Sequence, residues 1–145
     1  MKMILMMTLL LIPVVAPAAE GDIGLTAHNM FDNRISLGLS SKIKHRQLVN
    51  MRSQMLALQT IIGLLAKEKF DKAAKITRTK LGLTDEMKQI YELSNNEDFK
   101  KLGLAFHNST GELDTALQSK DMSKSLNALS YTMGYCSQCH GKFRQ

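Results

Sequence analysis

Apolar residues recur every three or four positions through most of the chain, and no alternating strand pattern rich in valine and isoleucine runs through the residues after the first 18. This spacing predicts helices. The first long helix covers residues 41–67, and its apolar side chains form one stripe, the inward seam expected of a helix in a bundle. The seam consists of Leu48, Met51, Met55, Leu58, Ile62 and Leu65.

Two shorter helical pieces and a third long helix follow. Asp71 is a suitable N-cap for the first piece, which extends to Leu81 before Gly82 interrupts the pattern. Thr84 can cap the second piece, whose apolar residues are Met87, Ile90, Tyr91 and Leu93. The long helix over residues 97–118 is predicted to turn these side chains inward: Phe99, Leu102, Phe106, Leu113 and Leu117.

The last helix is predicted to begin after Asp121, its N-cap, and to run to the end of the sequence. Its seam steps by four and three residues without a slip, through Met122, Leu126, Leu129, Met133, Cys136, His140 and Phe143. Amphipathic helices with short connections predict an all-α fold, an antiparallel up-down-up-down four-helix bundle over residues 41–145. Residues 19–40, with three glycines, are expected to form an irregular or short-helical lead-in.

The first 18 residues have the pattern of a secretory signal peptide: a basic Lys2, a short apolar run, and Ala16 and Ala18 placed for cleavage. The alternative is a membrane anchor, but the apolar run is shorter than the ~20 residues that span a bilayer. We therefore expect export to the periplasm, cleavage after Ala18, and no stable membrane insertion of the mature chain.

Charge and composition narrow the classes of partner. The chain has 145 residues and a formal net charge of +6, which becomes +5 when Lys2 is removed with the signal peptide. This moderate excess suits an acidic protein partner or an anionic cofactor. Nucleic-acid binding is not expected, because basic residues do not cluster and few aromatic residues are available for stacking.

The only two cysteines, Cys136 and Cys139, are three residues apart, and His140 follows the second directly. A redox disulfide is one interpretation, but such pairs usually lie at a helix N-terminus, which lowers the thiol pKa, and here they lie near a C-terminus. A zinc site is a second interpretation. The motif would supply three ligands, and the fourth would have to be His28, His45 or His107. A structural disulfide would close too small a loop to stabilise much.

Covalent haem attachment fits every feature of the cluster. C-x-x-C-H is the c-type haem signature, in which two thiols one helical turn apart bind the two vinyl groups and the next histidine binds the iron. The pattern therefore predicts one covalent haem c near the C-terminal end of the last helix. Cys136 and Cys139 would form the thioethers and His140 would be the proximal iron ligand.

The terminal sequence CSQCHGKFRQ resembles the cytochrome c prime family, in which an aromatic residue and an arginine, here Phe143 and Arg144, closely follow C-x-x-C-H. The resemblance spans residues 42–145 and implies a four-helix bundle with haem c near its C-terminus. Family members also carry an arginine one turn before the distal haem residue. Arg46 and Met51 are the corresponding pair here, with a spacing of five residues in place of the family's four.

The distal position decides the function. Among Met51, Met55 and Met30, we favour Met51 as the distal ligand, because it lies on the seam near the end of the first helix that faces the haem. The alternative for any such methionine is core packing. Arg46 could contact a haem propionate or lie solvated on the surface. His45 and His107 are expected on the surface, and His28 is uninformative.

A His/Met-ligated haem is low-spin and suits electron transfer. We therefore predict a periplasmic monohaem electron carrier rather than an enzyme, with redox partner proteins that are acidic. The alternative is a five-coordinate protein that binds nitric oxide or carbon monoxide at an open distal site. Family resemblance also implies that a homodimer could form through the first helices.

Overall fold

The computed structural model describes residues 32–145. Most of the predicted lead-in and all of the predicted signal peptide, with His28 and Met30, lie outside the described residues. The elements are β1 (Ile35–Ser36), α1 (Ser41–Leu65), α2 (Phe70–Ile76), a π-helical segment (Thr77–Leu81), α3 (Asp85–Leu93), α4 (Glu97–Gln118), α5 (Met122–Lys142) and β2 (Phe143–Arg144). The all-α prediction is confirmed.

Side-chain caps fix the start of four helices. Ser40, Thr84, Asn96 and Asp121 each accept a hydrogen bond from the backbone N–H three residues later. The prediction for α2 is corrected: its N-cap is Lys69, without a side-chain bond, and Asp71 lies inside the first turn. An acidic residue there still stabilises the helix N-terminus.

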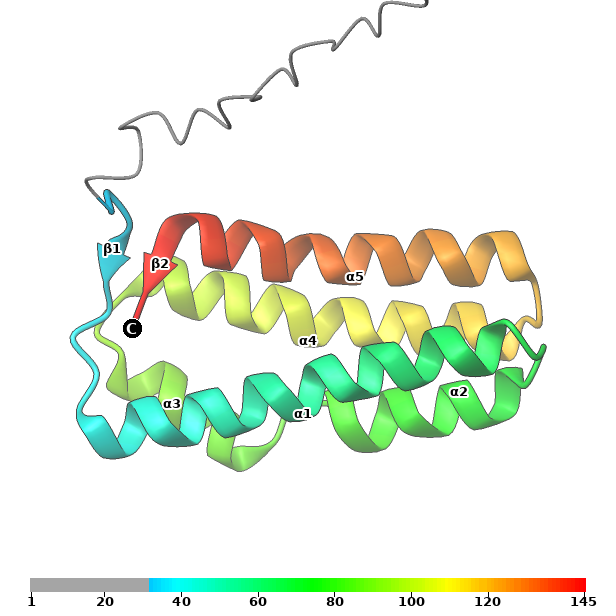
Figure 1. Cartoon of the computed structure of the whole chain (residues 1–145), viewed down its shortest axis with the longest axis horizontal. Coiled ribbons are helices and arrows are strands. Elements are labelled where there is room, and N and C mark those ends of the chain that lie inside the picture. The colour runs from blue at the N-terminus through cyan, green and yellow to red at the C-terminus, as the bar shows by residue number, and fades with distance from the viewer. Residues whose placement is uncertain (1–31) are drawn as a thin grey trace, which may run out of the picture. The chain divides into compact units, whose positions relative to one another are not determined.

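The long helices lie alongside one another in Figure 1. From the end that carries β1, α1 and α4 run away, while α2 and α5 run back toward it. Helix α4 packs on α5 along its length, and α1 packs mainly on α2 and the π-helical segment. Few contacts join α1 to α5, and the functional cavity opens between these two helices. No described helix has the length and apolar character needed to cross a bilayer.

Two apolar clusters form the core. The larger joins α1, α2, α4 and α5 around Leu58, Ile61, Leu113, Leu117 and Leu129. The smaller lies at the end of the bundle that carries β2. Its buried members are Leu37, Met87, Ile90, Tyr91, Phe99 and Phe143. This second cluster closes one end of the cavity.

The predicted seam of the first helix is partly wrong. Leu48, Met55 and Ile62 are exposed, whereas Gln47 and Ile61 are buried. In α5, Leu126 is likewise exposed, and the buried face contains Ser125, Leu129 and Thr132. The reason is that α1 and α5 are separated by the cavity, so each turns its packed face toward a different neighbour.

The prediction that the last helix runs to the end of the sequence is also corrected. Helix α5 ends at Lys142, and Phe143 leaves the helical path in an extended conformation. Residues Phe143–Arg144 pair in parallel with Ile35–Ser36, a strand contact that the helical periodicity did not predict. Phe143 is 4 % exposed and packs edge-on against Phe99, with ring centroids 5.7 Å apart. Burial of this ring explains the break, because a continued helix would carry it elsewhere.

Candidate haem site

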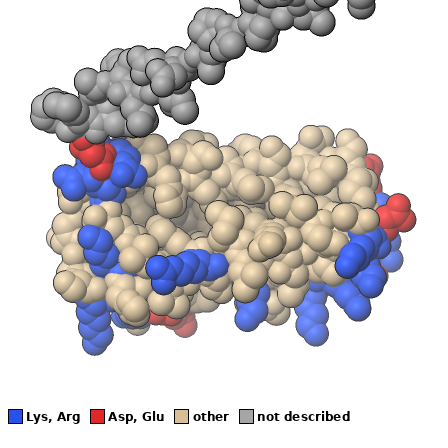
Figure 2. Space-filling view, viewed as in Figure 1, with Lys and Arg blue, Asp and Glu red and all other residues tan. Residues whose placement is uncertain are grey.

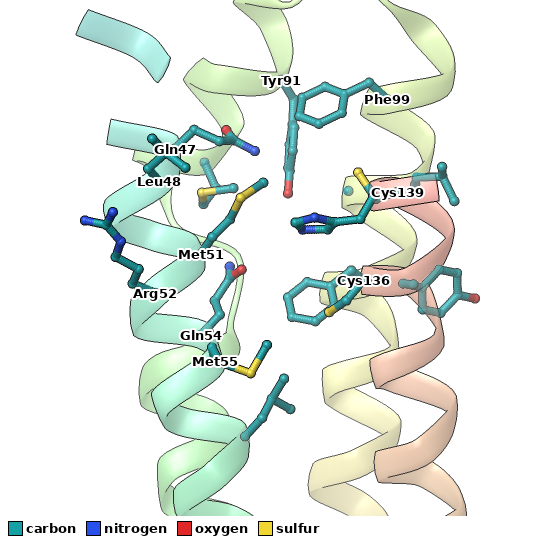
Figure 3. A pocket seen from close by; sticks show the side chains of 17 residues that line it. Gln47, Leu48, Met51, Arg52, Gln54, Met55, Tyr91, Phe99, Cys136 and Cys139 are labelled. Carbon is teal, nitrogen blue, oxygen red and sulfur yellow. The ribbon is translucent and has the colours of Figure 1, made fainter. Parts of the chain in front are cut away.

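A cavity of about 270 Å³ lies between α1 and α5 and is closed by α3 and α4. Figure 2 shows a hollow on this face of the molecule, surrounded mainly by residues that are neither basic nor acidic. Seventeen residues line it, and most of the surface they present is apolar. In Figure 3, Met51 and Met55 extend from α1 toward Cys136 and Cys139 on α5.

The α5 wall brings together the three residues of the haem-attachment motif. Cys136, Cys139 and His140 all line the cavity. Both cysteine side chains are half-buried and their sulfurs are not bonded to each other. His140 is exposed, because its ring borders the open cavity rather than a packed helix. The three residues predicted from the sequence therefore lie together on one wall of this cavity.

The electrostatics of the two thiols disfavour the redox interpretation. Burial raises the pKa of Cys136, and burial together with the nearby Cys136 raises the pKa of Cys139 to about 11. A reactive C-x-x-C thiol needs a lowered pKa. Nor do three or more His, Cys, Asp or Glu side chains converge on a metal-ion site anywhere in residues 32–145. This finding argues against the zinc interpretation.

The α1 wall supplies the facing side chains. Met51 is half-buried and lines the cavity, as does Met55, which is 59 % exposed. The Gln145 amide Nε2 donates a hydrogen bond to Met51 Sδ at 3.7 Å. Met87 also reaches the cavity, from α3 rather than from the wall that faces α5, and its Sδ accepts a hydrogen bond from Asn50 Nδ2 at 3.2 Å. Of these methionines, Met51 combines partial burial with a position facing α5.

One polar side chain on the α1 wall lacks a partner. Gln47 is 3 % exposed and lies one turn before Met51. Its Oε1 is buried without a hydrogen bond, and Figure 3 shows the amide directed into the cavity. An unpaired buried acceptor costs about 1–3 kcal/mol. A polar group or water held in the cavity would satisfy this oxygen.

Behind the end wall, a buried histidine is hydrogen-bonded to Tyr91, and its position corrects the sequence prediction. His107 is 6 % exposed rather than on the surface. Its Nδ1 lies 2.8 Å from the Leu81 carbonyl oxygen, and its Nε2 lies 3.1 Å from the Tyr91 hydroxyl. A carbonyl can only accept, so Nδ1 carries the proton and Tyr91 donates to Nε2. Burial lowers the His107 pKa, and burial raises that of Tyr91, so both groups stay neutral.

Arg46 is not among the residues that line the cavity. Its Nε forms an ion pair with Glu86 Oε1 at 2.8 Å, between α1 and α3. Arg52, one residue after Met51, lines the cavity instead. The propionate contact of Arg46 stays a prediction.

The residues present fit a haem. Two thiols and an imidazole lie on one wall, a thioether lies on the facing wall, and the remaining wall is largely apolar with an unpaired acceptor at Gln47. Thiols and an imidazole at this spacing are the donor set of a c-type haem. Cys136 and Cys139 would hold the macrocycle, and His140 would bind its iron.

Comparison with known families agrees with this chemistry. The family model described as Cytochrome C' matches residues 75–144. The matched residues make up just under half of the chain, and they are similar to the cytochrome c′ family. The match supports a c-type cytochrome, and the matched residues include Cys136, Cys139 and His140. No curated protein and no solved structure matches the chain.

The cytochrome c′ match leaves out part of the cavity. Met51 and Gln47, which line the cavity from α1, lie before the matched residues, and Gln145, which contacts Met51, lies after them. Sequence reasoning missed Gln47, Gln145 and the His107–Tyr91 pair. For His107 the only sequence feature that could have drawn attention was its position directly after the apolar Phe106. Both residues are buried in the structure. The amides gave no signal, because polar residues on a helix are usually solvated.

Proposed function

We propose that this protein is a periplasmic electron carrier with one covalent haem c, ligated by His140 and Met51. The observation that supports it best is the placement of Met51 on the cavity wall that faces α5, which carries His140 and the two cysteines (Figure 3). When bound, haem supplies an iron that takes up and releases one electron. His140 would hold it from α5, and Met51 would complete its ligation from α1.

The cavity lining favours electron transfer over catalysis. Peroxide chemistry would need a distal acid–base pair, and the sequence offered only His45 with Arg46. Neither lines the cavity, and Arg46 is paired with Glu86. The cavity surface as a whole is largely apolar, although Gln47, Arg52 and Gln54 contribute to its α1 side, and apolar side chains exclude water from a redox centre without reacting with a substrate.

The location and partners follow from the sequence. We propose export through the signal peptide, with a mature chain that begins near Ala19. The mature net charge of about +5, obtained by removing Lys2 from a chain of +6, favours acidic redox partners at moderate ionic strength. A homodimer is a further proposal, carried over from the family resemblance.

Optical spectroscopy tests the proposal. We expect the exported ferrous protein to give a low-spin spectrum that carbon monoxide does not change. A Met51→Ala variant should become high-spin and bind carbon monoxide, because alanine cannot ligate the iron. The exposed Met55→Ala variant is the matched control and should stay low-spin.

Two results would contradict the proposal in different ways. A wild-type high-spin spectrum that shifts with carbon monoxide would favour the five-coordinate gas-binding alternative. A mass, measured after denaturation, that equals the mature polypeptide without one haem would remove the cytochrome assignment itself.

A further inference from the structure

We infer that Gln145 is a positioning residue for Met51, which holds its thioether toward the cavity and raises the reduction potential of the haem. The inference rests on the proposed ligation by Met51. It does not come from the family match, because both residues lie outside residues 75–144.

The contact joins two distant parts of the chain. Gln145 Nε2 lies 3.7 Å from Met51 Sδ, within the range of a hydrogen bond to sulfur, and the two residues are 94 positions apart. A thioether sulfur carries only lone pairs, so the amide must present its N–H2 group and not its oxygen. Since the sulfur has two lone pairs, a metal can use one while Gln145 donates to the other.

The backbone before Gln145 is fixed by several contacts. The Leu37 N–H donates to the Arg144 carbonyl at 3.0 Å, as part of the pairing between β1 and β2. Phe143 is buried against Phe99. These contacts anchor both preceding residues, and from this fixed backbone the Gln145 side chain extends to Met51. It reaches α1 five residues after His140, so one short segment links the two proposed ligands.

The unpaired atom of the same amide supports a role beyond packing. Gln145 Oε1 is buried and has no hydrogen-bond partner in the structure. Rotating the amide would give the oxygen no better neighbour, since Met51 sulfur cannot donate. In this orientation the Gln145 amide donates to the Met51 sulfur, while its own oxygen stays without a hydrogen bond. Hydrogen bonds around a metal ligand fix its direction and tune the metal.

The expected effect has a definite sign. A donor to Met51 Sδ withdraws electron density from the sulfur, which disfavours the oxidised iron more than the reduced iron. Replacing Gln145 with leucine keeps the side-chain size and removes the donor. We expect Gln145→Leu to lower the midpoint potential. The oxidised-to-reduced ratio at a fixed electrode potential should rise about two- to fivefold, within the range of one weak hydrogen bond.

The experiment compares three haem-loaded, full-length variants: Gln145→Leu, Met51→Leu and the control Gln59→Leu. Gln59 is an exposed glutamine of α1 that does not line the cavity. Each variant is measured by spectroelectrochemistry and by NMR of the ligand methyl group in the reduced state. A lower potential with a shifted methionine methyl signal in Gln145→Leu, and wild-type values in Gln59→Leu, support the inference.

The two proposals fail in distinguishable ways. If Met51→Leu abolishes the low-spin spectrum while Gln145→Leu retains the wild-type potential and methyl signal, the inference about Gln145 is wrong and the ligation stands. If Met51→Leu stays low-spin, the ligation is wrong and the inference falls with it. Gain of tighter Met51 ligation in Gln145→Leu would also overturn it, because Gln145 would then be competing with the iron.

Discussion

The Tyr91 hydroxyl donates a hydrogen bond to His107 Nε2 at 3.1 Å, and through it the end wall of the cavity is joined to the core. On its other side His107 Nδ1 donates to the Leu81 carbonyl at 2.8 Å, at the end of the π-helical segment. The imidazole is therefore held in one neutral tautomer. Tyr91 cannot rotate away without leaving a buried ring nitrogen unpaired, which stabilises the shape of the cavity.

The free energy of unfolding should decrease as the pH is lowered, because of this histidine. Burial lowers the pKa of His107 below 6.5, so in that range the unfolded chain binds a proton that the folded chain does not. The free energy of unfolding therefore decreases as pH falls from 6.5 to the folded-state pKa, and it is constant for this group above 6.5. Urea unfolding of the full-length protein between about pH 7 and about pH 5 measures the slope.

Two variants isolate the His107 contribution. His107→Gln removes the titration while its amide can still donate to Leu81 and accept from Tyr91, so the slope should flatten. His45→Gln replaces an exposed histidine and should leave the slope unchanged. An identical slope in the wild type and His107→Gln would show that His107 is not the titrating group.

Gly103 on α4 is required by its contact with Tyr91. A Cβ at this position would overlap the Tyr91 ring and hydroxyl. We expect Gly103→Ala to destabilise the protein by about 1–3 kcal/mol, as overpacking of a core does. Gly111→Ala on the same helix meets no neighbour and should be neutral or stabilising by up to about 1 kcal/mol. Equal Tm values for the two variants would contradict this.

Each of the two cysteines should form its own thioether bond to the haem, and either bond alone should hold it. Cys136→Ala or Cys139→Ala alone should retain haem after denaturation through the remaining thioether, whereas the double variant should release it. Ser137→Ala, between them, is the control and should match the wild type. Mass spectrometry after acid denaturation reads out each case. Retention of haem by the double variant would show that attachment does not use these sulfurs.

Variants of Arg46 and Glu86 test whether Arg46 serves only in an ion pair or also contacts the haem. Because its Nε is already paired with the Glu86 carboxylate at 2.8 Å, we expect Arg46→Ala and Glu86→Ala to lower stability by similar, small amounts. A partly exposed pair contributes about 0–1 kcal/mol. Neither variant should change the reduction potential. If only Arg46→Ala shifts the potential, the propionate contact predicted from the sequence is correct.

The helices could be predicted from the sequence because they depend on local spacing, and the haem-attachment motif, which stays a prediction, is equally local. The bounds of α4 and the caps of α3 and α5 were predicted correctly, since a cap and a 3.6-residue period act within a few residues. The C-x-x-C-H spacing likewise needs only one helical turn. The family match over residues 75–144 includes the same local pattern.

Only the tertiary structure decided which face of each helix is buried and which side chains meet across the cavity. Leu48 and Met55 looked like core residues but border the open space, and His107 looked solvated but is buried. Periodicity shows that a helix has an apolar face, but the neighbour that covers it depends on packing among segments far apart in the chain. The contact between Gln145 and Met51, 94 residues apart, exists only because β2 pairs with β1 and directs the end of the chain back to α1.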